Sequence, residues 1–188
     1  MNYCNQCGSS ISKLIPPADD RERFVCEGCG YIHYQNPRII VATLPCYEDK
    51  VLLCKRAIEP RYGLWTLPGG FMENGETTHH GALRETREEA CAEVELLDIY
   101  SLYNLPQINQ VHIFFRATMQ NLNFSAGAES LEVRLFTEAE IPWDKMAFTP
   151  VSETLKHYFE DRKKGAFPMH CAEVCTDPDT DTRISRRL

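Results

Sequence analysis

Residues 70–91 read GFMENGETTHHGALRETREEAC. At helical spacing, Glu88 and Glu89 follow Glu85 by three and four positions, so the three carboxylates share one face. Like charges this close destabilise a bare helix. A hard divalent cation bound between them makes the same arrangement stabilising. The stripe therefore predicts that Glu85, Glu88 and Glu89 bind Mg²⁺ or Mn²⁺, which prefer carboxylate oxygen. The alternative is a solvated acidic helix face, as most charge runs are.

Two neighbours of the stripe are expected to steady it. Arg84 flanks Glu85, and Glu76 lies near the start of the helix, so we expect an Arg84–Glu76 ion pair that holds Glu85 in place. The preceding Leu67-Pro68-Gly69-Gly70 indicates a turn that brings the backbone close to a ligand. The carbonyl of Gly70 is a candidate further ligand of the metal.

Four cysteines near the N-terminus form two pairs with the spacing of a zinc site: Cys4, Cys7, Cys26 and Cys29. A glycine follows each pair, at Gly8 and Gly30, and lets the chain turn back so that amide groups face the thiolates. The pattern predicts structural Zn²⁺. Two disulfides are the alternative, which a secreted context would favour.

Five further cysteines remain. We expect Cys46, Cys54 and Cys91 to be buried small hydrophobes, because they lie in apolar stretches. Cys171 and Cys175 are either unremarkable or a second metal half-site or redox pair.

The charged positions around the stripe resemble the Nudix box, G-x5-E-x7-R-E-U-x-E-E-x-G-U, where U is a bulky aliphatic. The chain departs from that pattern at Thr86, Cys91 and Ala92. The resemblance implies an α/β fold, a Nudix α/β/α sandwich with a mixed sheet. It also implies metal-dependent hydrolysis of a nucleoside diphosphate linked to another moiety, giving two monophosphates. By resemblance, the catalytic residues are Glu85, Glu88, Glu89, Arg84 and Glu76.

The expected organisation is a zinc ribbon at residues 1–35, a Nudix domain at 36–165 and a partly flexible tail at 166–188. Strands are expected at 38–45, 50–56, 94–103, 110–119 and 131–136, and a helix at 77–91. A last helix should begin with Thr149 as its N-cap and Pro150 at the first position, and end at Gly165.

The composition argues against two classes of partner, nucleic acids and membranes. The net charge of −7 argues against a nucleic-acid partner, and no apolar run approaches a membrane span. With no signal or transit sequence recognised, a bacterial cytoplasm is expected. We expect a small-molecule substrate, and the ribbon is a candidate for assembling a homodimer.

Segments outside the box reduce the range of possible substrates, through their resemblance to particular Nudix enzymes. A four-cysteine ribbon before a Nudix domain resembles NADH pyrophosphatases, but their SQPWPFPxS signature is absent. The plastid FAD pyrophosphatase group of plants is more similar, in YQNPRIIV, ESLEVRLF and IPWDKMAFTPVSETL. That resemblance implies FAD or ADP-ribose as substrate, with AMP plus FMN or ribose 5-phosphate as products. The alternatives are NADH or a nucleotide sugar, and a nucleotide-sensing regulator whose ribbon contacts DNA.

Aromatic rings of such a substrate need stacking partners, and its pyrophosphate needs cations. Candidate substrate contacts are Tyr34, Tyr62, Tyr103, Phe148, Arg38, Arg56 and Arg61. Glu129 and Glu132 are candidate general bases or substrate contacts, with ordinary surface charges as the alternative. Trp65 and His79 are expected on apolar surfaces rather than in the site.

Overall fold

This computed structural model describes residues 1–176 and 183–187. The chain divides into two compact units, Met1–Pro37 and Arg38–Leu188. The boundary that we expect between residues 35 and 36 falls in the segment that joins the last strand of the first unit to the first strand of the second.

The first unit is a small antiparallel sheet in the order β1-β2-β3. Its strands are β1 (Ile11–Leu14), β2 (Arg23–Cys26) and β3 (Ile32–His33). Gly8 and Gly30 both have positive φ, 76° and 72°, and each amide donates back to the first cysteine of its pair. The two glycines therefore close the cysteine turns as the sequence indicates.

The second unit is built on one mixed sheet, in the order β10-β5-β4-β9-β8-β11-β12. β4 runs parallel to β9, and β8 runs parallel to β11, while the other neighbours are antiparallel. The strands are β4 (Arg38–Tyr47), β5 (Lys50–Arg56), β6 (Trp65–Thr66), β7 (Gly69–Phe71), β8 (Val94–Leu105), β9 (Gln110–Met119), β10 (Ser130–Phe136), β11 (His170–Thr176) and β12 (Arg183–Arg187).

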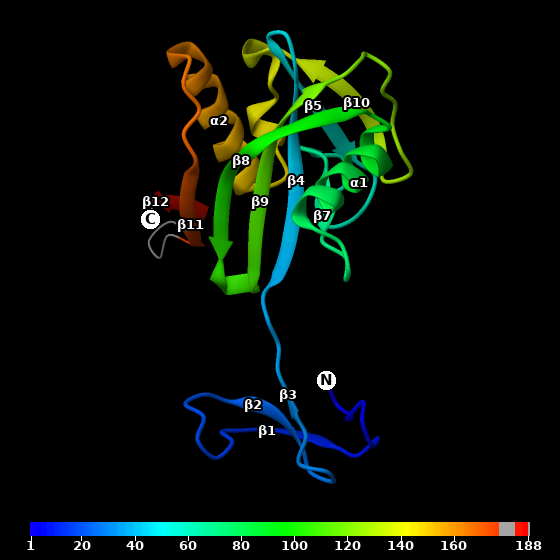
Figure 1. Ribbon diagram of the computed structural model, residues 1–188, viewed down its shortest axis with the longest axis vertical. Helices are drawn as coiled ribbons and strands as arrows, with labels where there is room; N and C mark the ends of the chain where they lie inside the picture. Colours follow the sequence, from blue (N-terminus) through cyan, green and yellow to red (C-terminus); the bar gives the residue numbers. More distant parts are fainter. Residues whose placement is uncertain (177–182, 188) are drawn as a thin grey trace. The chain divides into compact units, whose positions relative to one another are not determined.

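Two helices cover opposite faces of this sheet (Figure 1). Along β5, Val51 and Leu53 pack with helix α2 (Thr149–Lys164), whereas Leu52 and Cys54 pack toward the end of helix α1 (Thr78–Ala90). This alternation is what a strand buried on both faces requires. The predicted α/β/α sandwich with a mixed sheet is confirmed.

The helix limits follow local chemistry. Thr77 caps α1 by accepting from the His80 amide at 3.1 Å. The predicted cap of α2 is wrong by one residue: Phe148 occupies the N-cap and Thr149 is already helical, with no side-chain capping bond. Gly165 ends α2 with φ 69°, as expected. Short 3₁₀ turns occupy Pro106–Ile108, Glu138–Glu140 and Trp143–Lys145.

Two segments differ from the expected outline. The Gly-Gly turn is the strand β7, which pairs with β4. The segment expected as a tail supplies β11, because Ala172 and Val174 are buried and Asp161 accepts from His170 Nε2 at 2.6 Å. Residues 177–182 and 188 of that expected tail lie outside the described residues. Among the helices described, none is long and apolar enough to cross a membrane.

Candidate active site and zinc centre

The carboxylate stripe lies on the last two turns of α1, and its members differ in burial. The Glu89 residue is 5% exposed and the side chain of Glu85 is 13% exposed, whereas that of Glu88 is 58% exposed. Two carboxylates therefore lie in a low-dielectric pocket beside β7, and the third extends toward solvent.

Arg84 holds the stripe together. Its Nη1 group donates to Glu85 at 2.7 Å and to Glu88 at 3.0 Å. Its Nη2 and Nε groups donate to the two carboxylate oxygens of Glu76 at 2.8 and 3.1 Å, a bidentate pair. Nη2 also donates to the carbonyl of Phe71 at 3.1 Å. The expected Arg84–Glu76 pair is thus present, and Arg84 joins helix α1 to β7.

β7 approaches the carboxylates closely enough that a side chain at Gly70 would displace the Glu85 carboxylate. A Cβ on Gly70 would lie 2.6 Å from both carboxylate oxygens of Glu85. The Gly69 amide donates to Glu89 Oε2 at 3.1 Å. The backbone of this strand therefore forms one wall of the carboxylate pocket, which leaves the Gly70 carbonyl as a candidate metal ligand.

The electrostatics of the pocket favour a cation. Burial raises the pKa of Glu89 from its ordinary 4.5 to about 7, and the charge of Glu85 adds to the rise. Burial also raises the pKa of Glu85, against the opposing effect of Arg84. Glu76 behaves oppositely: hydrogen bonds from Arg84 lower its pKa to about 2. A divalent cation would stabilise the two buried carboxylates in their charged form.

The departures from the box are accommodated by packing. Thr86 is fully buried, and its hydroxyl donates to the Ala82 carbonyl at 2.7 Å and lies 2.6 Å from the hydroxyl of Thr43 on β4. Ala92 is buried as well. The expectation that Cys91 is buried is wrong: it is exposed and ends α1 in the left-handed conformation, with φ 48°. Cys54 is buried as expected, and Cys46 is partly buried.

The loop between β9 and β10 folds against the C-terminal end of α1. The Gly127 amide donates to the Glu89 carbonyl at 3.0 Å, and a Cβ on Gly127 would lie 1.7 Å from the Glu88 carbonyl oxygen. Glu129 lies two residues further on, and its charge contributes to the raised pKa of both Glu85 and Glu89, below the effect of burial.

Of the two candidate bases, Glu129 belongs to the loop that contacts the end of α1 through Gly127. Glu132 is exposed on β10 and lies 3.9 Å from Lys55. The sequence offers both in GAESLE. The close approach of Gly127 to the end of α1 distinguishes Glu129 from Glu132. That contact joins residues far apart in the chain.

The candidate substrate contacts fall in different places. The Arg56 guanidinium lies 5.2 Å from the ring centre of Phe148, and that of Arg38 lies 4.7 Å from the ring centre of Phe71. Phe71 is 46% exposed beside Gly70, and no sequence pattern had singled it out. Tyr103 is fully buried in the core, out of reach of a substrate.

Other aromatic candidates lie elsewhere. Tyr34 belongs to the first unit, where the Arg23 guanidinium stacks at 5.2 Å from its ring centre. Tyr62 is exposed in the loop after β5. Trp65 is in the core and His79 packs on Phe115, both as expected.

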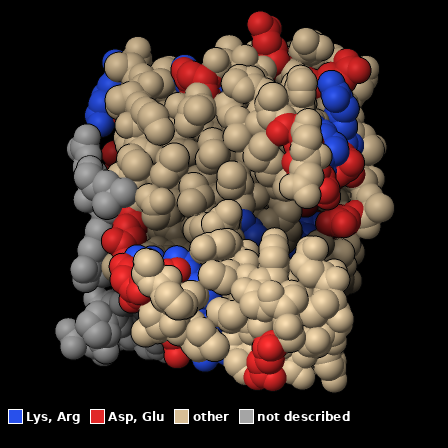
Figure 2. All heavy atoms as spheres, turned by 60° about the horizontal axis from the view of Figure 1, so that its bottom comes forward, with Lys and Arg blue, Asp and Glu red and all other residues tan. Residues whose placement is uncertain are grey.

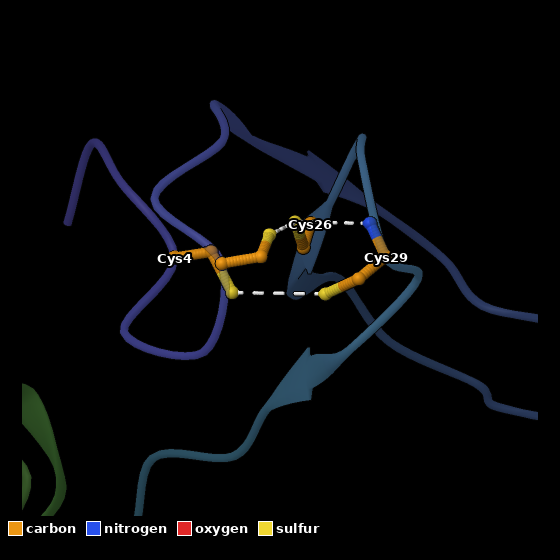
Figure 3. Close-up of side chains that lie close together, drawn as sticks. Cys4, Cys26 and Cys29 are labelled. Carbon is orange, nitrogen blue, oxygen red and sulfur yellow. Dashed lines mark hydrogen bonds between the residues drawn. The ribbon is translucent and has the colours of Figure 1, made fainter.

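The four N-terminal cysteines converge, as Figure 3 shows for three of them. The Sγ atoms of Cys4 and Cys29 are 3.9 Å apart, and those of Cys7 and Cys26 are 3.4 Å apart. A tetrahedral zinc site with Zn–S bonds of about 2.3 Å has sulfur atoms about 3.8 Å apart, so the set fits Zn²⁺. All nine cysteines are free of disulfides, which removes the disulfide alternative.

The amides of Gln6 and Cys29 face the sulfur atoms of Cys4 and Cys26, each at 3.4 Å. His33 is a residue that the sequence reasoning missed: its Nε2 lies 3.3 Å from Cys4 Sγ, and the histidine is buried. Its place shortly after the second cysteine pair is the one signal that could have indicated it.

Within residues 1–176 and 183–187, these cysteines are the one group in which three or more potential ligand atoms lie within 4.8 Å of one another. Cys171 and Cys175 join no such group there. Among the described residues, Glu85, Glu88 and Glu89 do not form such a group.

The surface charge agrees with the composition. On the face drawn in Figure 2, Lys and Arg side chains form small separate groups, mostly beside Asp or Glu.

Comparisons with known proteins find a matching family for each of the two parts of the chain. A family model described as NUDIX domain matches residues 36–164, and one described as Nudix N-terminal, a zinc ribbon, matches residues 2–35. An ADP-ribose pyrophosphatase from Methanocaldococcus jannaschii is 30% identical over 148 residues, which are 77% of this chain and 82% of that protein.

Two further likenesses add to this. A crystal structure of a NUDIX hydrolase from Nitrosomonas europaea is 51% identical with a TM-score of 0.90, covering 92% of this chain and 98% of that one. An NAD-capped RNA hydrolase from Photobacterium profundum is 29% identical over 75% of this chain. The chain spans about half, 52%, of the length of that hydrolase.

Proposed function

The chain belongs to the Nudix hydrolases, as a NUDIX domain with the family's N-terminal zinc ribbon, and on that premise we propose that it cleaves the pyrophosphate bond of a nucleoside diphosphate linked to another group. ADP-ribose and FAD are the leading substrates. The observation that carries the proposal is the pair of buried carboxylates, Glu85 and Glu89, beside the backbone of Gly69 and Gly70.

The division of roles follows from burial and contacts. Glu85 and Glu89 would hold Mg²⁺ or Mn²⁺, and the exposed Glu88 and the Gly70 carbonyl would be the further ligands. The bound cation supplies charge neutralisation for the phosphate oxygens and lowers the pKa of water. Arg84, fixed by Glu76, keeps Glu85 and Glu88 oriented.

Glu129 is the proposed general base. Two observations support this role: its charge acts on Glu85 and Glu89, and its loop contacts the end of α1, where the Gly127 amide donates to the Glu89 carbonyl at 3.0 Å. Glu129 accepts a proton from the attacking water as the new P–O bond forms and the bridging P–O bond breaks. The products are AMP and ribose 5-phosphate from ADP-ribose, or AMP and FMN from FAD.

Two observations support a substrate that carries an aromatic base. The ring of Phe71, the residue after Gly70, is half exposed, and the Arg38 guanidinium lies 4.7 Å from its centre. Such a platform suits stacking by adenine or flavin. For ADP-ribose, the printed activity of the methanogen relative gives additional support.

The test is a panel of ADP-ribose, FAD, NADH and a nucleotide sugar, each with Mg²⁺ or Mn²⁺, scored for AMP or the corresponding nucleoside monophosphate. We expect turnover of ADP-ribose or FAD to exceed that of the other two, and Glu85→Gln to abolish it. The matched control is Glu132→Gln, which removes a carboxylate that pairs with Lys55 away from the stripe. Equal rates for E85Q and the wild type would refute the metal-ligand assignment, and inactivity of the folded protein on the whole panel would refute the function.

The zinc centre has its own role in the proposal. The first unit contains short strands and little buried apolar surface, with Cys4 and Cys26 as its buried hydrophobic residues. A domain this small needs a metal or disulfides to be stable. We therefore assign Zn²⁺ a structural role, to be checked by metal analysis of the purified protein.

A further inference from the structure

A pair of buried threonine hydroxyls joins the carboxylate helix to the central sheet. Thr43 on β4 and Thr86 on α1 are both fully buried, and their hydroxyl oxygens are 2.6 Å apart. Thr86 also donates to the Ala82 carbonyl, one turn earlier in α1, at 2.7 Å. A hydroxyl has one proton to donate, so Thr43 donates to Thr86 and Thr86 donates to Ala82. The Nudix box has a bulky aliphatic residue where this chain has Thr86, so the box does not account for the pair.

Thr43 also holds the segment that leads into β7. Its backbone amide donates to the Pro68 carbonyl at 3.0 Å. From the next residue, Gly69, which lies opposite Ala42, β7 pairs antiparallel with β4. One residue of β4 therefore binds the segment before β7 through its backbone and α1 through its side chain.

The two buried carboxylates lie on one side of this attachment. At about 3.6 residues per turn, Glu85 is about 100° and Glu89 about 60° around the helix from Thr86, in the same direction. The Gly69 amide donates to Glu89 Oε2 at 3.1 Å. A Cβ on Gly70 would lie 2.6 Å from the carboxylate oxygens of Glu85. Both carboxylates thus face β7, and the rotation of α1 about its own axis sets their distance from that strand.

Apolar packing fixes that rotation less tightly than a hydrogen bond does. The apolar cluster between α1 and the sheet contains Val41, Ala82 and Phe115. Apolar contacts have no preferred direction, whereas a hydrogen bond weakens steeply when its angle falls below about 120°. A carboxylate about 6 Å from the helix axis moves by about 1 Å when the helix turns by about 10°. Metal–ligand distances are defined to within about 0.2 Å, so such a turn would disturb a metal site more than it would disturb the fold.

We propose that the Thr43–Thr86 hydroxyl pair positions the metal-binding carboxylates, by fixing the rotation of α1 against the strand that also holds β7. The two threonines are positioning residues: both are fully buried, and they act through Glu85 and Glu89. The inference rests on the proposed function, because it requires that these glutamates bind the cation. In the simpler alternative, the pair only fills the core, and two apolar side chains would serve equally well there.

Four variants separate the two alternatives. Thr86→Val leaves the buried Thr43 hydroxyl without its acceptor, and the double variant T43V/T86V removes both hydroxyls at nearly constant shape. Thr86→Ser keeps the hydroxyl and loses only a methyl group. The matched control is Thr154→Val on α2, at the opposite face of the sheet. Thr154 is also fully buried, donates to the Pro150 carbonyl at 2.8 Å and lies 2.8 Å from the Ser101 hydroxyl.

The first measurement is titration of the full-length proteins with Mn²⁺, in which the free ion is followed by electron paramagnetic resonance. Binding that the wild type shows and Glu85→Gln lacks is assigned to the carboxylates. We expect T86V and T43V/T86V to bind this Mn²⁺ at least about tenfold more weakly than the wild type. T86S and T154V should stay within about twofold of the wild type, because both keep the hydroxyl pair between α1 and β4.

The second measurement is thermal unfolding without Mn²⁺, which should rank the variants differently. T86V and T154V each leave a buried hydroxyl without a partner and should lose at least about 3 °C in Tm. T86S should lose about 2–4 °C, through the missing methyl group. T43V/T86V should return to within about 2 °C of the wild type, because neither hydroxyl remains to be satisfied.

Weaker Mn²⁺ binding by T43V/T86V despite its recovered stability supports the positioning role. Wild-type affinity in T43V/T86V would overturn it. An equal loss of affinity in T154V would also overturn it, because general loosening of the fold would then explain the effect. Inactivity of the wild type on the nucleotide panel would refute the proposed hydrolysis, while the Mn²⁺ titration would still decide the role of the pair. Equal Mn²⁺ binding by the wild type and E85Q would overturn the metal assignment and the positioning role together.

Discussion

Replacing Glu89 by Gln should stabilise the metal-free protein at alkaline pH. Glu89 is 5% exposed, and burial raises its pKa from 4.5 to about 7. The unfolded chain ionises above pH 4.5 while the folded chain keeps its proton until about pH 7. Stability is therefore lost as pH rises through this window, by about 3 kcal/mol for a pKa difference of about 2.5. Gln does not titrate, and its amide oxygen can still accept from Gly69.

The difference in stability between E89Q and the wild type should thus grow by about 3 kcal/mol between pH 5 and pH 8, or about 6–12 °C in Tm for a domain of this size. Saturating Mg²⁺ should reverse the order at pH 8, because the cation stabilises the charged wild-type pocket. The assay is thermal unfolding followed by tryptophan fluorescence. Both tryptophans, Trp65 and Trp143, belong to the second unit, so the signal reports that unit.

Magnesium is left out rather than chelated in the metal-free arm, because a chelator would also strip zinc from the cysteines. Glu88→Gln is the matched control: its side chain is 58% exposed, so removing the charge brings no comparable gain. A gain for E89Q that is the same at pH 5 and pH 8, or no gain at either, would refute the reasoning that burial of a carboxylate shapes this site.

Three other perturbations test the remaining contacts. Gly70→Ala should lower kcat/KM at least about tenfold, because a Cβ there would lie 2.6 Å from the Glu85 oxygens; an unchanged rate would show that β7 is free to move. Cys4→Ser should abolish zinc retention by atomic absorption while Trp fluorescence of the second unit is kept, and loss of both signals would contradict the division into two units. His33→Gln should speed zinc release to a chelator about tenfold, through the lost contact with Cys4 Sγ at 3.3 Å, and release at the wild-type rate would leave the histidine without a part in the site.

The sequence predicted those parts of the site that depend on neighbours along the chain. Helical periodicity alone puts Glu85, Glu88 and Glu89 on one face, and CxxC spacing with a following glycine puts each cysteine pair in one turn. The strands β4 and β5 followed from equally local patterns, and the α/β/α sandwich followed from the resemblance to the Nudix box. The expected Thr149 cap failed by one residue because cap geometry depends on how the preceding segment is held, here by the bond from Ala147 to Trp65.

The sequence by itself determined that three glutamates share one helix face and that each cysteine pair lies in one turn, because these spacings relate neighbours along the chain. Only the tertiary structure decided which other groups reach them. Gly70 lies against Glu85, the loop that carries Glu129 contacts the end of α1, and Arg56 meets the start of α2. These contacts join distant segments, and their distances depend on how strands and helices pack, which no local pattern specifies.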